Sequence, residues 1–109
     1  MSASASLSTH VLDTHNGRPA SGLRVALSRI DDGREVSIGV RQTDSDGRVR
    51  EFATGLTPGT YRLSFDVGSY FKDRHGLFSS VCLEVVLDAG HHHVPLLVSP
   101  FACIAYRGT

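Results

Sequence analysis

Hydrophobic and polar residues alternate along much of the chain, which is the two-residue period of a β-strand with one buried face. In the segment 60–67, every second residue is large and apolar: Tyr61, Leu63, Phe65 and Val67. The same alternation runs through 22–30, 35–42 and 80–87, and shorter candidate strands span 9–12, 48–52, 91–98 and 102–106. The pattern therefore predicts about eight short strands.

Turn-forming residues separate these segments. Asn-Gly-Arg-Pro at 16–19, Asp-Asp-Gly at 31–33, Asp-Ser-Asp-Gly at 44–47 and Thr-Pro-Gly at 57–59 supply residues that tolerate positive φ. Regularly spaced short strands of this kind indicate an antiparallel sandwich or barrel. Only 68–75 lacks alternation, and one short helix is expected there. Residues 1–6 are small and polar, and we expect them to be flexible.

Length and charge narrow the choice of function. The chain has 109 residues, the size of one domain, and its 11 basic and 11 acidic side chains give a net charge of zero. That balance argues against binding to nucleic acid or to an anionic membrane surface. No apolar run approaches the roughly 20 residues of a membrane helix. Two distant cysteines and the absence of a secretory leader favour a reducing cytoplasm.

Six histidines are the unusual feature of the composition, and three of them are consecutive at 91–93. In a strand, His92 shares the apolar face of Val94, Leu96 and Val98, so this face is expected to look into the core. His91 and His93 share the opposite, outward face. Two outward imidazoles can be merely solvated, bind an adventitious metal or move a proton. The sequence names no convincing third ligand, so no metal site is predicted.

Three further segments carry candidate chemistry. His10 lies in an early strand, where a lone histidine is more often structural. Arg48 follows the acids and glycine of 44–47, which resemble a calcium loop but lack its later ligands, so a loop with Asx-type turns is expected. Arg48 can clamp a planar polar ligand or simply be a surface arginine. An apolar strand runs almost to Tyr106-Arg107-Gly108-Thr109, which indicates that this end is tied down.

Taken together, the segments LSTHVLDTHNGRPASGL, TDSDGRV and HHHVPLLVSPF…YRGT resemble the 5-hydroxyisourate hydrolase family, a branch of the transthyretin-related proteins. The resemblance runs in order from Leu7 to Thr109. It implies one all-β domain over 1–109, a transthyretin-like sandwich of two four-stranded sheets with one short helix. It also implies a cytoplasmic homotetramer, a dimer of dimers with active sites in the clefts between dimers. The implied reaction is hydrolysis of 5-hydroxyisourate to 2-oxo-4-hydroxy-4-carboxy-5-ureidoimidazoline in urate degradation, without cofactor or metal.

The resemblance also implies roles for residues. Those matching catalytic positions are His10, Arg48, His93 and Thr109; those matching substrate-binding positions are His10, Arg48, His91, Tyr106 and Arg107. An imidazole, with an ordinary pKa near 6.5, suits deprotonation of water. An arginine or a protonated histidine suits the oxyanion that follows. The sequence leaves open which histidine is the base.

Two departures from the family pattern stand out. His92 replaces the usual tyrosine between the paired histidines. Because His92 is expected on the opposite face of the strand from His91 and His93, we predict that it alters packing more than chemistry. Ala102-Cys103-Ile104-Ala105 is more apolar than the usual stretch and is expected to reshape a pocket wall or an interface.

Three other interpretations compete with the hydrolase. A transthyretin-like carrier would bind a small molecule without catalysis. A structural β-sandwich appendage would leave the coincidence of the motifs without a reason. A zinc-dependent hydrolase would lose its rate in the presence of a chelator.

Overall fold

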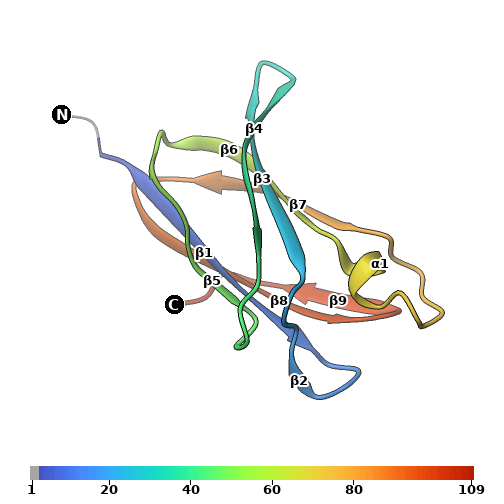
Figure 1. Cartoon of the computed structure of the whole chain (residues 1–109). Coiled ribbons are helices and arrows are strands. Elements are labelled where there is room, and N and C mark those ends of the chain that lie inside the picture. Colours follow the sequence, from blue (N-terminus) through green and yellow to red (C-terminus); the bar gives the residue numbers. More distant parts are fainter. Residues whose placement is uncertain (1–2) are drawn as a thin grey trace.

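Two facing β-sheets make up most of the molecule, which is described here by a computed structural model covering residues 3–109 (Figure 1). The strands, in chain order, are β1 (Ala5–Asp13), β2 (Arg18–Pro19), β3 (Arg24–Asp31), β4 (Arg34–Gln42), β5 (Arg48–Leu56), β6 (Gly59–Phe65), β7 (Val81–Leu87), β8 (Gly90–Ser99) and β9 (Ala102–Ala105). One short helix, α1 (Val67–Tyr70), follows β6. All eight predicted strands are present. Within residues 3–109, no helix is long and apolar enough to cross a membrane.

One sheet has four strands and the other has five. The first sheet has the order β4-β3-β6-β7. In the second, β2-β1-β8-β9 is the main path and β5 also pairs with β1. The prediction of two four-stranded sheets is therefore corrected by β2, a two-residue strand that pairs Leu12 with Pro19. So short a strand carries no alternation for a pattern to reveal.

β1 and β8 lie side by side in parallel, from the pair Ala5–Gly90 to the pair Asp13–Val98. The prediction of an antiparallel sandwich or barrel is corrected at this one pair, since hydrophobic alternation does not encode strand direction. Ala5 and Ser6, expected to be flexible, belong to β1 because β8 extends far enough to pair with them. Residues 1 and 2 lie outside the described part of the chain.

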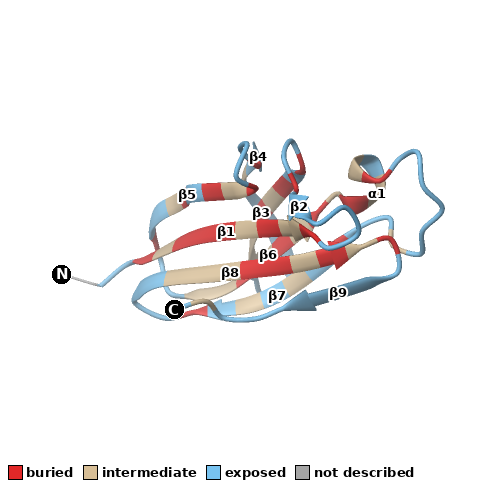
Figure 2. Cartoon of the chain, turned by 90° about the horizontal axis from the view of Figure 1, so that it is seen from below, coloured by how far each residue is buried: buried red, intermediate tan, exposed pale blue. Residues whose placement is uncertain are grey.

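The core fills the space between the sheets. Leu7, Val11, Val25, Leu63 and Leu96 are all 0% exposed. For Val25, Leu63 and Leu96 this confirms the predicted buried faces of their strands. Figure 2 shows buried positions along β1, β3 and β8, whereas β9 is exposed throughout. Val36, Ile38 and Val40 of β4 alternate like core residues, yet all three are at least 41% exposed.

Local turn chemistry explains the connections. Asp32 and Gly33 both have positive φ, 49° and 77°, as a type I′ hairpin between β3 and β4 requires. Asp66 caps the helix by accepting a hydrogen bond from the amide of Ser69. The helix covers only 67–70 rather than the predicted 68–75, and the chain turns immediately afterwards.

Candidate active site

Strand alternation places a polar surface on the outer face of the second sheet. Leu7, Thr9 and Val11 of β1 are 0% exposed, so Ser8 and His10 point outward. An open cavity of about 730 Å³ lies over this face. It is lined by residues from β1, β5, β8 and the C-terminal segment: Ser8, Thr9, Arg48, Arg50, His91, His93, Arg107, Gly108 and Thr109.

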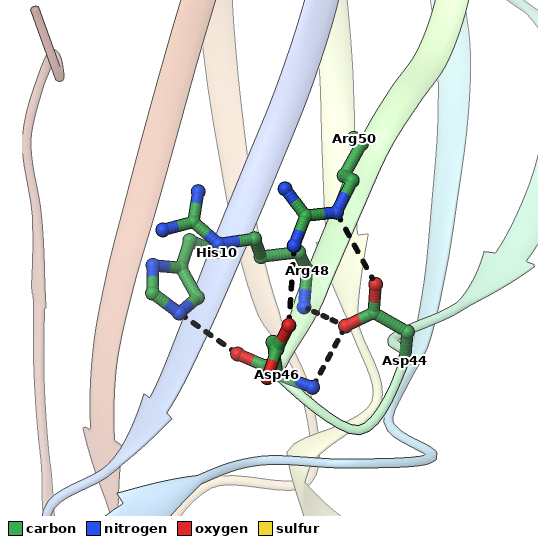
Figure 3. Close-up of polar contacts among 5 residues, drawn as sticks. All are labelled: His10, Asp44, Asp46, Arg48 and Arg50. Carbon is green, nitrogen blue, oxygen red and sulfur yellow. Dashed lines mark hydrogen bonds and ion pairs between the residues drawn. The ribbon is translucent and has the colours of Figure 1, made fainter.

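The loop before β5 holds Arg48 in place. The carboxylate of Asp44 accepts hydrogen bonds from the amides of Arg48 and Asp46, both at 2.9 Å (Figure 3). The amide of Arg48 contributes most to lowering the pKa of Asp44, followed by the Asp46 amide and the nearby arginine charges. Gly47 has φ 76° and lies so close to β1 that an added Cβ would be 2.3 Å from the carbonyl oxygen of Val11. The predicted Asx-turn loop is thus confirmed.

The two arginines of β5 differ in what they contact. Arg50 pairs with Asp46 at 3.1 Å and with Asp44 at 3.8 Å. Across residues 3–109, no carboxylate pairs with the guanidinium of Arg48, which extends beside the ring of His10 (Figure 3). Arg48 is therefore the β5 arginine whose hydrogen-bond donors are available to a bound ligand.

His10 lies next to this cavity and is not part of its lining. It is the register partner of Arg48 across β1 and β5. Its Nε2 is 2.9 Å from the carbonyl oxygen of Asp46, and because a carbonyl only accepts, Nε2 carries the proton. In the neutral ring, Nδ1 is consequently the basic nitrogen.

Ser8 lies between the two outward histidines of β8. Its Oγ is 2.7 Å from Nδ1 of His93 and 2.9 Å from Nε2 of His91. Ser6 extends this series of hydrogen bonds, because its Oγ is 2.7 Å from Nδ1 of His91. The prediction that His91 and His93 share a face is confirmed, because both contact one side chain.

The sequence does not single out these two serines, because residues 1–6 are expected to be flexible and Ser8 has no unusual chemistry of its own. A usable signal was present. Ser6 and Ser8 alternate with Leu7 and Thr9 and continue the two-residue period of His10.

The environment of His93 favours its neutral form. Burial is the main cause that lowers its pKa below the ordinary 6.5, and the charges of Arg48, His10 and His91 add to the effect. A histidine that is neutral near pH 7 has a free nitrogen lone pair and is able to accept a proton.

The C-terminal segment is bound to β8, as expected. The amide of Gly108 donates to the carbonyl of His93 at 2.7 Å. An added Cβ at Gly108 would be only 2.5 Å from Cδ2 of the His93 ring. The close approach brings Arg107 and Thr109 into the cavity lining.

Tyr106 lies elsewhere. It is 53% exposed and lines a second hollow of about 430 Å³ between β7 and the strands β8 and β9. His92 lines the same hollow, and its Nε2 donates to the carbonyl of Asp88 at 2.9 Å. Arg107 and His93 line both this hollow and the cavity described above. The predicted contact of Tyr106 with substrate stays a prediction.

At one cavity, the arrangement combines an imidazole whose lowered pKa favours its neutral form with guanidinium donors that no carboxylate in the described part of the chain engages. Within residues 3–109, no group of three or more His, Cys, Asp or Glu side chains is placed to hold a metal ion. Such a cavity can accept a proton from water and stabilise negative charge on a flat polar ligand.

Fold and site together define a transthyretin-like β-sandwich that carries a histidine-arginine cavity on one sheet. The chain belongs to the HIUase/Transthyretin family, whose model matches residues 7–108.

Individual relatives and solved structures are consistent with this family assignment. The 5-hydroxyisourate hydrolase of Deinococcus radiodurans is 38% identical over 119 aligned positions, with both chains covered completely. The solved structure of Klebsiella pneumoniae 5-hydroxyisourate hydrolase superposes with a TM-score of 0.87 at 33% identity, covering 96% of this chain and 99% of that one. Sea bream transthyretin in complex with thyroxine gives a TM-score of 0.84 at 27% identity, covering 94% of each chain.

Proposed function

We propose that this protein hydrolyses 5-hydroxyisourate, opening its ring in the degradation of urate. The observation that carries the proposal is that one cavity holds His93, whose pKa is lowered mainly by burial, and lies beside the Arg48 guanidinium, with which no carboxylate of residues 3–109 pairs. The named hydrolases among its relatives support the same activity.

The reaction can be written on these residues. His93 removes a proton from water as the oxygen attacks the ring acyl carbon, forming a tetrahedral intermediate. Arg48 stabilises the oxyanion through its guanidinium, an interaction stronger in the transition state than in the ground state. The carbon–nitrogen bond then breaks, and the proton held by the imidazole passes to the departing nitrogen, so atoms and charge balance.

The remaining site residues have supporting roles in this proposal. His10 presents its basic Nδ1 beside Arg48 and orients the water or substrate. His91, Arg107 and Thr109 offer hydrogen bonds to the carbonyl and N–H groups of a flat, polar substrate. We assign the role of the base to His93, because burial lowers its pKa and favours the neutral imidazole.

We further propose that the chain assembles as a homotetramer, a dimer of dimers. β7 and β9 are edge strands that border the same hollow. Val86 of β7 is 71% exposed and Ile104 of β9 is 62% exposed. Open apolar edges favour pairing with a second copy. Light scattering on the purified protein is expected to give four times the 11.7 kDa of one chain.

We place the enzyme in the cytoplasm. Cys82 and Cys103 are both free and exposed, which suits a reducing compartment.

The activity is tested directly by generating 5-hydroxyisourate from urate with urate oxidase and following its absorbance. The protein is expected to accelerate the decay well above the spontaneous rate, with or without a chelator. A decay equal to the spontaneous rate would refute hydrolysis, and a rate abolished by the chelator would favour a zinc-dependent enzyme.

A carrier is the second candidate, favoured by the likeness to sea bream transthyretin in complex with thyroxine. It predicts saturable binding of a small molecule and no turnover. Calorimetry with thyroxine, set beside the decay assay, separates the two functions.

A further inference from the structure

A continuous series of hydrogen bonds links the two histidines that line the cavity, His93 and His91, through Ser8 and ends at Ser6. It runs from Nδ1 of His93 to Oγ of Ser8, from there to Nε2 of His91, and from Nδ1 of His91 to Oγ of Ser6. The three contacts measure 2.7, 2.9 and 2.7 Å, all within the range of true hydrogen bonds. Ser8 is only 6% exposed, so water does not readily replace its partners.

Counting protons limits how this series of hydrogen bonds can be arranged. A serine hydroxyl has one proton to donate and accepts through its oxygen. Ser8 therefore cannot donate to both imidazoles, and at least one ring nitrogen that faces it must carry a proton.

One arrangement also suits catalysis. If Nδ1 of His93 donates to Ser8, the Ser8 hydroxyl donates to Nε2 of His91. The lone pair of His93 is then on Nε2, which makes no hydrogen bond within residues 3–109. The base is thereby prepared at a nitrogen that remains free for water.

We propose that Ser8 is a positioning residue that fixes the tautomer of His93 and relays protons between His93 and His91. The proposal deepens the hydrolase function and rests on it. It concerns a residue that contacts both histidines and need not touch the substrate.

The relay is balanced step by step. When Nε2 of His93 takes a proton from water, Nδ1 gives its proton to Ser8 as the Ser8 proton moves to Nε2 of His91. His93 ends neutral with its proton on Nε2, Ser8 is unchanged, and His91 becomes an imidazolium. Return of the proton along the same path accompanies protonation of the leaving nitrogen by His93.

The surroundings give the relay its direction. His93 is half-buried, whereas His91 is exposed, so a positive charge is better solvated on His91. Charged or titratable groups that share a cavity lining with His93, or act on it electrostatically, come from several elements: Arg48 and Arg50 of β5, His10 of β1, Glu84 of β7, and Arg107 and the terminal carboxylate of Thr109. Arg48 keeps its charge, so it opposes a cation on His93 at every working pH.

The test compares three variants of the full-length protein. Ser8→Ala removes the bridging hydroxyl, Ser8→Thr retains it, and Ser6→Ala is the matched control that removes a hydroxyl bonded to His91 alone. We expect kcat to fall about 10- to 100-fold in Ser8→Ala and to stay within about threefold of wild type in the other two.

A second readout does not depend on activity. Nitrogen-15 chemical shifts of the histidine rings report which nitrogen carries the proton. We expect protonated Nδ1 for neutral His93 in the wild type and in Ser8→Thr, and loss of that preference in Ser8→Ala.

The outcomes are distinguishable. A wild-type protein without hydrolase activity would refute the proposed function, while the ring shifts would still decide the tautomer. An active wild type with Ser8→Ala at full kcat would overturn the relay. A slow Ser8→Ala with unchanged His93 shifts, or without recovery in Ser8→Thr, would assign Ser8 a merely structural role and also overturn it.

Discussion

Neighbouring residues of β1 face opposite sides of one sheet and meet opposite environments. Leu7 is 0% exposed and packs in the core, whereas Ser8, the next residue, contacts the two outward histidines of β8. The same holds on β8, where Leu96 is 0% exposed and His93 lines the cavity. The inner face stabilises the sandwich and the outer face carries the chemistry, so stability and activity should be separable one residue at a time.

The largest expected effect is on the outer face. His93→Ala should reduce kcat by about 10² to 10⁴-fold, because it removes the base, and His10→Ala should fall in the same range. The thermal midpoint should change by only a few degrees, since a half-buried polar side chain contributes little to the core. Steady-state kinetics and thermal unfolding measure the two quantities.

His92→Ala is the control for this change, because His92 lies on the opposite face and contacts the Asp88 carbonyl. It should keep nearly full activity. Equal losses in His92→Ala and His93→Ala would contradict the separation of faces.

The inner face should show the reverse behaviour. Leu7→Ala is expected to lower the free energy of unfolding by about 2 to 5 kcal/mol, because it leaves a cavity in the core. Leu7→Met, which conserves volume, should cost less than about 1.5 kcal/mol. Denaturant titration gives both values, and kcat of the folded Leu7→Ala protein should be unchanged. A large drop in its kcat would show that the faces are coupled.

The sequence predicted the strands well because alternation and turn chemistry are local signals. Tyr61, Leu63 and Phe65 repeat every second residue, and Asp32-Gly33 marks a hairpin without knowledge of the rest of the chain. Strand neighbours are long-range information. The parallel pairing of β1 with β8 joins residues 85 positions apart, such as Ser8 and His93, and no local pattern encodes it.

The site was predicted in part for the same reason. His10, His91, His93 and Arg48 drew attention as unusual side chains, and the structure brings them to one face. Ser8 has no unusual chemistry until its two partners are known. The alternation of Val36, Ile38 and Val40 predicts a buried face, yet all three are exposed. Alternation marks one face of a strand without showing whether anything covers it.

Gly108 offers a smaller test of the outer face. In Gly108→Ala the new methyl group would approach Cδ2 of His93 to 2.5 Å, so the ring must move. We expect kcat to fall about 10- to 100-fold, since a displacement of roughly 1 Å costs about that much. Gly39→Ala is the control, because the three atoms nearest its new methyl would all belong to the flexible guanidinium of Arg41. Kinetics decide: full activity in Gly108→Ala would show that the ring tolerates displacement.

The smallest expected effect is on the pH dependence of the free energy of unfolding. Burial lowers the pKa of His93 in the folded protein below the 6.5 of an ordinary histidine, so the unfolded chain binds this proton first as the pH falls. The free energy of unfolding should therefore be highest above pH 6.5 and decline below it, because the unfolded state holds more protons there. Replacing His93 by Gln removes this site, so the variant should lose less stability than the wild type between pH 8 and pH 5. The other histidines are present in both proteins, so the difference between the two denaturant curves isolates His93. A difference that stays constant with pH would contradict the lowered pKa, and with it the neutral base on which the outer face depends.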